Sequence, residues 1–155
     1  MDVRVVDGDL LRQPVEVIVN SWNRNFIPYW LLIPAGVSGA IRRQAGPMPF
    51  REVGKRGLLP VGEAVLTGAG RLPFKGIIHV AGLNWWWMAD RNSVQLSTRN
   101  ALRVFREHGF ASLAFPLIGA GTGGLSPQSV QQWMQAEIES QPGKGQVLLV
   151  RYRNQ

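Results

Sequence analysis

The stretch from Ser112 to Pro127 constrains the fold of this chain most, because a buried strand, a glycine loop and a helix start follow one another without interruption. The apolar run 113–118 contains no polar residue, which predicts a strand buried on both faces. Ser126 can cap the helix, and Pro127 suits its first position. A strand joined to a helix in this way builds sheets covered by helices, so we expect an α/β fold and look for function in the loop.

The loop itself carries four glycines in six residues, Gly119, Gly121, Gly123 and Gly124. Glycine tolerates positive φ angles and lets backbone N–H groups approach a ligand closely, an arrangement suited to a phosphate. The helix that follows adds the positive end of its dipole. The loop lacks the Gly-Lys-Ser/Thr ending of a P-loop, and the glycines alone leave an ordinary turn open as the alternative.

The chain has 155 residues and no cysteine, and His79 and His108 are its two histidines. This length suits one domain over residues 1–155 that buries its own core. Cysteine chemistry and histidine-rich metal sites are excluded, so we expect neither a metal nor a cofactor. The start of the chain lacks a signal-peptide pattern, and no apolar run approaches the roughly 20 residues of a membrane helix. We therefore expect a cytoplasmic protein without membrane association, and we take it as a monomer.

The net charge of +7 comes from 17 basic residues, mostly arginine, against 10 acidic ones. Arginine binds phosphate in a bidentate way that lysine cannot match. An anionic partner such as nucleic acid is one reading of this charge, and solubility is the other. The most basic segment runs from Arg42 to Arg56, where five basic residues accompany a single acid, Glu52.

The rest of the chain alternates between strand and helix patterns. Strands are predicted at 3–6, 16–20, 62–67, 76–81, 113–118 and 146–152, and helices at 36–46, 92–108 and 126–138. This order predicts a mixed, largely parallel sheet covered on both faces, with ligands at the carboxyl ends of its strands. His79 lies in the middle of an apolar strand, so we expect a hydrogen-bonded core residue rather than a catalytic one.

Three asparagines, Asn20, Asn23 and Asn25, lie within six residues at the end of the second strand. They are either turn formers or amide groups aimed at ligand hydroxyls, and the residues alone leave both readings open. Three consecutive tryptophans at 85–87 cannot all point into the core from a strand. At least one of them is expected to be available for stacking or for an interface.

Together these motifs resemble those of macrodomains, a family of ADP-ribose-binding proteins, and the resemblance runs nearly from end to end. The family's first-strand Gly-Asp-Ile has its counterpart at 8–10, its Val-Asn-Ala-Ala-Asn at 19–23, and its Gly-Val-Asp-Gly-Ala-Ile helix start at 36–41. The family's diphosphate loop corresponds to 118–124. The resemblance implies a three-layer α/β/α sandwich whose ligand is ADP-ribose, free or attached to a macromolecule.

The resemblance also implies roles for particular residues. Asp9 would accept a hydrogen bond from the adenine amino group, the asparagines would serve the distal ribose, and the glycine loop would wrap the diphosphate. The implied ligand-binding residues are Asp9, Leu10, Gly36, Val37, Gly119, Ala120, Gly121, Thr122, Gly123, Gly124 and Trp85. One of Trp85, Trp86 and Trp87, or else Trp22, would replace an aromatic residue that flanks the distal ribose in relatives. The candidate catalytic residues are Asn20, Asn23 and Ser38.

Two departures from the family pattern bear on the mechanism. Ser38 stands where many hydrolytic relatives carry a catalytic aspartate, and Gly123 stands where another branch carries one. A serine cannot act as a general base at neutral pH without a partner. The expected function is an ADP-ribosyl glycohydrolase that acts on modified DNA, such as thymidine-linked ADP-ribose, or on acidic protein side chains. The alternatives are a reader that binds ADP-ribose without chemistry and a basic nucleic-acid-binding protein.

Overall fold

The computed structural model of this chain describes residues 1–23, 36–56, 59–83, 89–120 and 124–152. Its centre is a six-stranded sheet in the order β1-β6-β5-β2-β4-β3. The strands are β1 (Val3–Gly8), β2 (Val17–Asn23), β3 (Ala64–Thr67), β4 (Gly76–Leu83), β5 (Ser112–Pro116) and β6 (Gln146–Tyr152). Neighbouring strands run parallel except β3, which pairs antiparallel with β4 at one edge. The predicted mixed, largely parallel sheet is therefore confirmed.

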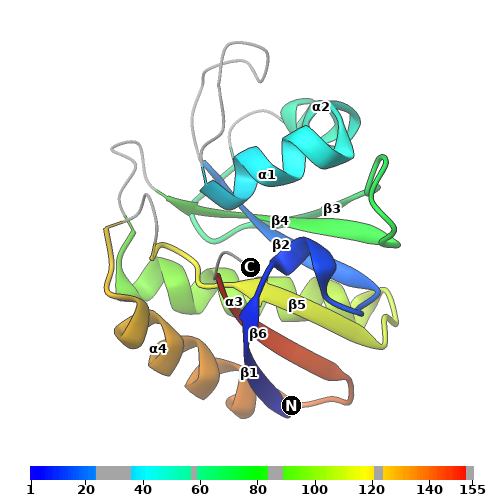
Figure 1. Ribbon diagram of the computed structural model, residues 1–155. Helices are drawn as coiled ribbons and strands as arrows, with labels where there is room; N and C mark the ends of the chain where they lie inside the picture. The colour runs from blue at the N-terminus through cyan, green and yellow to red at the C-terminus, as the bar shows by residue number, and fades with distance from the viewer. Residues whose placement is uncertain (24–35, 57–58, 84–88, 121–123, 153–155) are drawn as a thin grey trace.

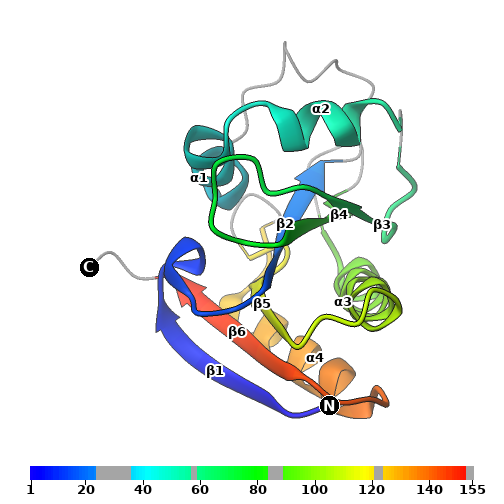
Figure 2. The same ribbon diagram turned by 90° about the vertical axis from the view of Figure 1, so that its right-hand side faces the viewer.

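Helices cover both faces of this sheet, as Figures 1 and 2 show. Helices α1 (Gly36–Ala45) and α2 (Met48–Gly54) lie over one face, and α3 (Arg91–Glu107) and α4 (Pro127–Ser140) lie over the other. Adjacent residues of β2 serve the two faces, because side chains alternate along a strand. Ile18 packs in the cluster under α1 and α2, and Val19 packs in the cluster under α3 and α4. The three-layer sandwich is confirmed.

Local signals explain where the helices of the second face begin. The carboxylate of Asp90 accepts the Ser93 N–H at 2.7 Å, and the Ser93 hydroxyl accepts the Asp90 N–H at 3.0 Å, which is a capping box at the start of α3. Ser126 caps α4 and Pro127 is its first residue, as predicted. The start of α4 is therefore set by the residues that end the glycine loop.

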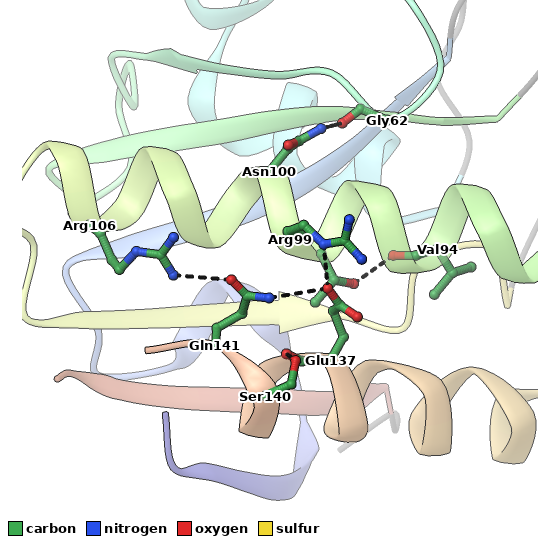
Figure 3. Close-up of polar contacts among 9 residues, drawn as sticks. Gly62, Val94, Arg99, Asn100, Arg106, Glu137, Ser140 and Gln141 are labelled. Carbon is green, nitrogen blue, oxygen red and sulfur yellow. Dashed lines mark hydrogen bonds and ion pairs between the residues drawn. The ribbon is translucent and has the colours of Figure 1, made fainter. Parts of the chain in front are cut away.

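A polar network joins the C-terminal halves of α3 and α4 (Figure 3). The Arg99 Nε donates to Glu137 Oε1 at 2.7 Å, and Gln141 Nε2 donates to the same oxygen at 3.3 Å. Arg106 in turn donates to Gln141 at 3.4 Å. The Glu137 side chain is only 10% exposed, so these donors offset the cost of burying its charge.

Some sequence-based boundaries were wrong, and pairing explains them. The first strand was expected to end at Val6, but β1 continues to Gly8 because β6 lies beside it in parallel register up to Tyr152. The second strand was expected to end at Asn20, but β2 continues to Asn23 alongside β4. The strand expected at 113–118 ends at Pro116.

Helix α2 was not expected at all, because its seven residues lie inside the most basic segment of the chain and include a proline. The helix forms because Pro49, Phe50 and Val53 are buried against the sheet, while Arg51 faces solvent. Tertiary burial thus stabilises a helix that is too short to be stable alone. A short 3-10 helix, η1 (Leu10–Arg12), likewise buries its two leucines.

Candidate functional site

The carboxyl ends of the parallel strands all lie at one edge of the sheet, and the segments singled out in the sequence follow these ends. Asp9 follows β1, helix α1 comes after β2, and the glycine loop follows β5. In open α/β sheets, ligands bind in the crevice outside this edge. A ligand site is therefore expected at this edge.

A pocket of about 570 Å³ opens there. Four parts of the fold contribute to its wall: the turn from β1 into η1, helix α1, the segment from β5 to α4, and the end of β6. Its lining residues are Asp9, Leu10, Leu11, Ala40, Arg43, Pro116, Leu117, Ala120, Pro127, Val150, Arg151 and Tyr152. The wall is mainly apolar with a few charged groups, which is typical of small-ligand sites.

Among these lining residues, Asp9 carries the one carboxylate, and it caps η1 at the same time. Its Oδ1 accepts the Leu11 N–H at 2.9 Å. The other carboxylate oxygen, Oδ2, has a distant ion pair with Arg12 Nε at 3.9 Å. The side chain is about one third exposed, at 32%. One carboxylate oxygen of Asp9 therefore stabilises η1, and the other oxygen can still accept a hydrogen bond from a ligand.

The glycine loop is held at both ends by backbone bonds. The Leu125 N–H donates to the Gly119 carbonyl at 3.1 Å, and the Ala120 N–H donates to the Leu117 carbonyl at 3.3 Å. Gly119 and Gly124 have φ angles of +83° and +79°, the left-handed region that the sequence predicted for this loop. Gly121, Thr122 and Gly123 lie outside the described residues, so their predicted contact with a diphosphate stays a prediction.

A buried hydrogen-bond chain lies on the β2, β4 and β3 strands beneath α1 and α2. Asn20 Nδ2 is 3.0 Å from His79 Nδ1, His79 Nε2 is 2.9 Å from Thr67 Oγ1, and Thr67 Oγ1 donates to the Gly68 carbonyl at 2.9 Å. Because the single Thr67 proton goes to Gly68, His79 must carry its own proton on Nε2. Nδ1 is then the acceptor for the Asn20 amide. The prediction of a hydrogen-bonded core histidine is confirmed.

Burial lowers the pKa of His79 to about 3, so the ring is neutral near pH 7. Asn20 is completely buried, and its Oδ1 has no hydrogen-bond partner among the described residues, while its Nδ2 is committed to His79. The role assigned to Asn20 in catalysis stays a prediction.

The remaining predicted residues are only partly described. Asn23 is the last residue of β2, and Gly36, Val37 and Ser38 form the first turn of α1. The side chains of Asn23, Val37 and Ser38 lie outside the described part of the chain, as does Trp85 altogether. Leu10 and Ala120 line the pocket together with Asp9, and their contact with ADP-ribose stays a prediction.

Nine of the twelve lining residues were not ligand-site candidates, and three of these nine, Arg43, Arg151 and Tyr152, carry charged or hydrogen-bonding groups. In the sequence, Arg43 stands out only as part of the basic segment. Arg151 and Tyr152 reach the pocket because β6 pairs with β1, which places Tyr152 opposite Gly8, next to Asp9. The signal that could have found them is the strand order, which cannot be read from local sequence.

Metal binding and membrane insertion each require a recognisable structural feature. Across the described ranges, no three His, Cys, Asp or Glu side chains gather in a way that could hold a metal ion. No helix in the described part of the chain has the length and apolar character needed to cross a membrane.

The fold and the pocket together define a class of protein: an α/β sandwich with a small-ligand site at the carboxyl edge of its sheet, beside a glycine loop and a carboxylate. Residues 19–134 match the Macro domain, and the chain belongs to that family. A Citrobacter koseri protein named O-acetyl-ADP-ribose deacetylase is 39% identical over 129 residues, which cover 79% of this chain and 70% of that protein.

Solved structures agree with this assignment. The Oceanobacillus iheyensis macrodomain with ADP is 29% identical, with a TM-score of 0.81 over 97% of this chain and 83% of that one. The macrodomain of Mycobacterium tuberculosis DarG is 25% identical, with a TM-score of 0.78 over 96% of this chain and 97% of that one. The chain is therefore similar both to a protein named O-acetyl-ADP-ribose deacetylase and to a macrodomain solved with ADP.

Proposed function

We propose that this protein binds ADP-ribose in the pocket beside Asp9 and hydrolyses the bond between its distal ribose and a macromolecule. The observation that carries the binding proposal is the pocket itself, where residues far apart in the sequence meet around one carboxylate and the anchored start of the glycine loop. The names of the relatives support the ligand, because one denotes removal of an acetyl group from ADP-ribose and another structure was solved with ADP.

Hydrolysis in this site would depend on positioning rather than on a strong base. Ser38 replaces the aspartate of many hydrolytic relatives, and the carboxylate of Asp90 is engaged in capping α3. The transition state of glycosidic cleavage gathers positive charge on the ribose, which the adjacent diphosphate of the ligand stabilises. Asn23, at the end of β2, would orient the attacking water against the anomeric carbon.

Incubating the protein with ADP-ribosylated substrate and measuring the ADP-ribose released tests this function. Asn23→Ala is expected to lower turnover by about 100-fold, because a misplaced water costs orientation, while the affinity for ADP-ribose changes far less. Ser38→Ala is the companion variant. Release at the parent rate by both variants would place the catalytic groups elsewhere. Tight binding of ADP-ribose with no release by the parent protein would establish the reader alternative instead.

The role proposed for Asp9 predicts that Asp9→Ala and Asp9→Asn will differ in their effect on the stability of the protein. Asp9→Ala should weaken ADP-ribose binding by about 1–3 kcal/mol, because a charged hydrogen bond to the adenine amino group is removed. It should also lower the free energy of unfolding by about 1 kcal/mol, because η1 is no longer capped. Asp9→Asn keeps an oxygen for the Leu11 N–H and should retain most of the stability.

Calorimetry with ADP-ribose and with its inosine analogue, together with thermal unfolding, separates the two effects. The parent protein should prefer ADP-ribose, since inosine lacks the amino group. If Asp9→Ala discriminates between the two ligands as well as the parent does, Asp9 does not recognise adenine.

The charge distribution favours DNA as the modified macromolecule. Residues 36–56 hold five basic residues and one acid, so most of the net charge of +7 is concentrated in this segment. Arg43, Arg51, Lys55 and Arg56 are exposed on α1 and at the end of α2. Since α1 contributes Ala40 and Arg43 to the pocket wall, a DNA strand whose modified base enters the pocket would bring its neighbouring phosphates toward this basic segment.

Activity on ADP-ribosylated DNA should therefore exceed activity on ADP-ribosylated protein and should fall as salt is added. Replacing both Arg51 and Lys55 by Ser should lower the salt slope of DNA binding by about one for each phosphate that the two side chains bind in the parent protein. Replacing Arg103 and Lys144, two exposed basic residues elsewhere on the molecule, makes the same charge change and should have less effect. Hydrolysis of protein conjugates alone, with no salt-sensitive activity on DNA, would contradict this choice of substrate.

A further inference from the structure

The wall of the pocket beside Asp9 holds two guanidinium groups and one carboxylate. Among its lining residues, Arg43 and Arg151 are basic and Asp9 is the acid. Asp9 already accepts the Leu11 N–H and has Arg12 as a distant ionic neighbour. The two arginines come from α1 and β6, so they converge on the pocket from different elements.

Arg151 is held in place by a carboxylate outside the pocket wall. Its Nε and one terminal nitrogen donate to the two oxygens of Asp7, at 2.8 and 3.2 Å, and the two residues are cross-strand neighbours in β6 and β1. This bidentate pair fixes the plane of the guanidinium. It uses two of the five N–H groups, so three donors remain for another acceptor.

Arg43 is the second guanidinium, and it has no salt bridge or hydrogen bond to any residue that the structure describes. It is exposed and lies about one helical turn after Ala40, another residue of the pocket wall. An arginine without an acidic neighbour in a partly apolar wall retains its full capacity for an anion.

Known nucleotide-binding sites show which ligand groups are bound by acidic and by basic side chains. In dinucleotide-binding Rossmann folds, a carboxylate beside the adenosine ribose recognises the free 2′-hydroxyl, whereas an arginine beside it accommodates a 2′-phosphate. Building on the proposed binding of ADP-ribose, we propose that this pocket prefers ADP-ribose that carries a 2′-phosphate on its adenosine ribose. Arg43 and the remaining donors of Arg151 would bind that phosphate, and they are specificity-determining residues rather than catalytic ones.

Calorimetry with ADP-ribose and with ADP-ribose 2′-phosphate tests this proposal through the ratio of the two dissociation constants. The parent protein should bind the phosphorylated ligand about tenfold more tightly, since new charged hydrogen bonds form. Arg43→Gln should reduce the ratio toward one, and Arg43→Lys should keep part of it. Arg103→Gln removes the same charge from an exposed position on α3 outside the pocket wall and should keep the ratio of the parent.

The outcomes separate this proposal from the proposed function. Tight binding of ADP-ribose with a ratio near one in the parent protein would overturn the 2′-phosphate preference and leave the proposed function standing. If the parent protein bound neither ligand, both the 2′-phosphate preference and the proposed function would be overturned. A high ratio that Arg43→Gln and Arg103→Gln lower equally would show a general charge effect and would overturn the assignment to Arg43.

Discussion

Lowering the pH from about 7.5 to about 5 is expected to reduce the free energy of unfolding by about 2 kcal/mol through His79 alone. The ordinary pKa of histidine is 6.5, and burial lowers that of His79 to about 3 in the folded protein. Between these values the unfolded chain binds a proton that the folded protein does not bind. Stability is therefore complete above about pH 6.5 and is lost as the pH falls toward 3.

His79→Gln provides the matched variant, because an amide side chain also offers one acceptor, for Asn20, and one donor, for Thr67. Its unfolding free energy, measured by urea denaturation across this pH range, should vary far less than that of the parent. His108→Gln replaces the other, exposed histidine and should keep the parental slope. If the parent and His79→Gln show the same pH dependence, His79 is not the group that titrates on unfolding.

Gly119→Ala is expected to lower the free energy of unfolding by about 2–5 kcal/mol and to abolish measurable ADP-ribose binding. A left-handed conformation costs an alanine about 1–2 kcal/mol, and Gly119 has a φ of +83°. The added Cβ would also lie 2.7 Å from Ala89 Cβ and 3.2 Å from Leu125 Cδ1. Overpacking of this kind typically costs a further 1–3 kcal/mol or so, and it displaces the segment that leads into the glycine loop.

Two other glycines separate these contributions. Gly109 has a φ of +68°, and a Cβ added to it would have nothing within 4 Å. Gly109→Ala should therefore show only the free-energy cost of the left-handed backbone and should leave ligand binding intact. Gly124 is equally unobstructed by the described residues, with a φ of +79°, but it ends the loop. Gly124→Ala should therefore match Gly109→Ala in stability while weakening ADP-ribose binding. Equal stability of Gly119→Ala and Gly109→Ala would show that the contact with Ala89 relaxes without cost.

Much of the framework could be predicted because its signals are local. The strand at 146–152, the helix that starts at Gly36 and the cap at Ser126 all occur where the sequence predicted them. Each depends on residues that are neighbours in the chain, such as a capping hydroxyl or an unbroken apolar run. The position of His79 among apolar residues predicted a buried, hydrogen-bonded ring for the same reason.

Other features depended on which segments become neighbours in space. The extension of β2 to Asn23, the burial that makes α2 a helix, and the identity of the partners of His79 follow from packing against distant elements. The meeting of Arg43 and Arg151 with Asp9 requires that the last strand pair with the first and that α1 contribute to the same pocket wall. Propensities and motifs act over a few residues, whereas strand order and burial are set by the free energy of the whole packed sheet, so only the tertiary structure decided the composition of the pocket.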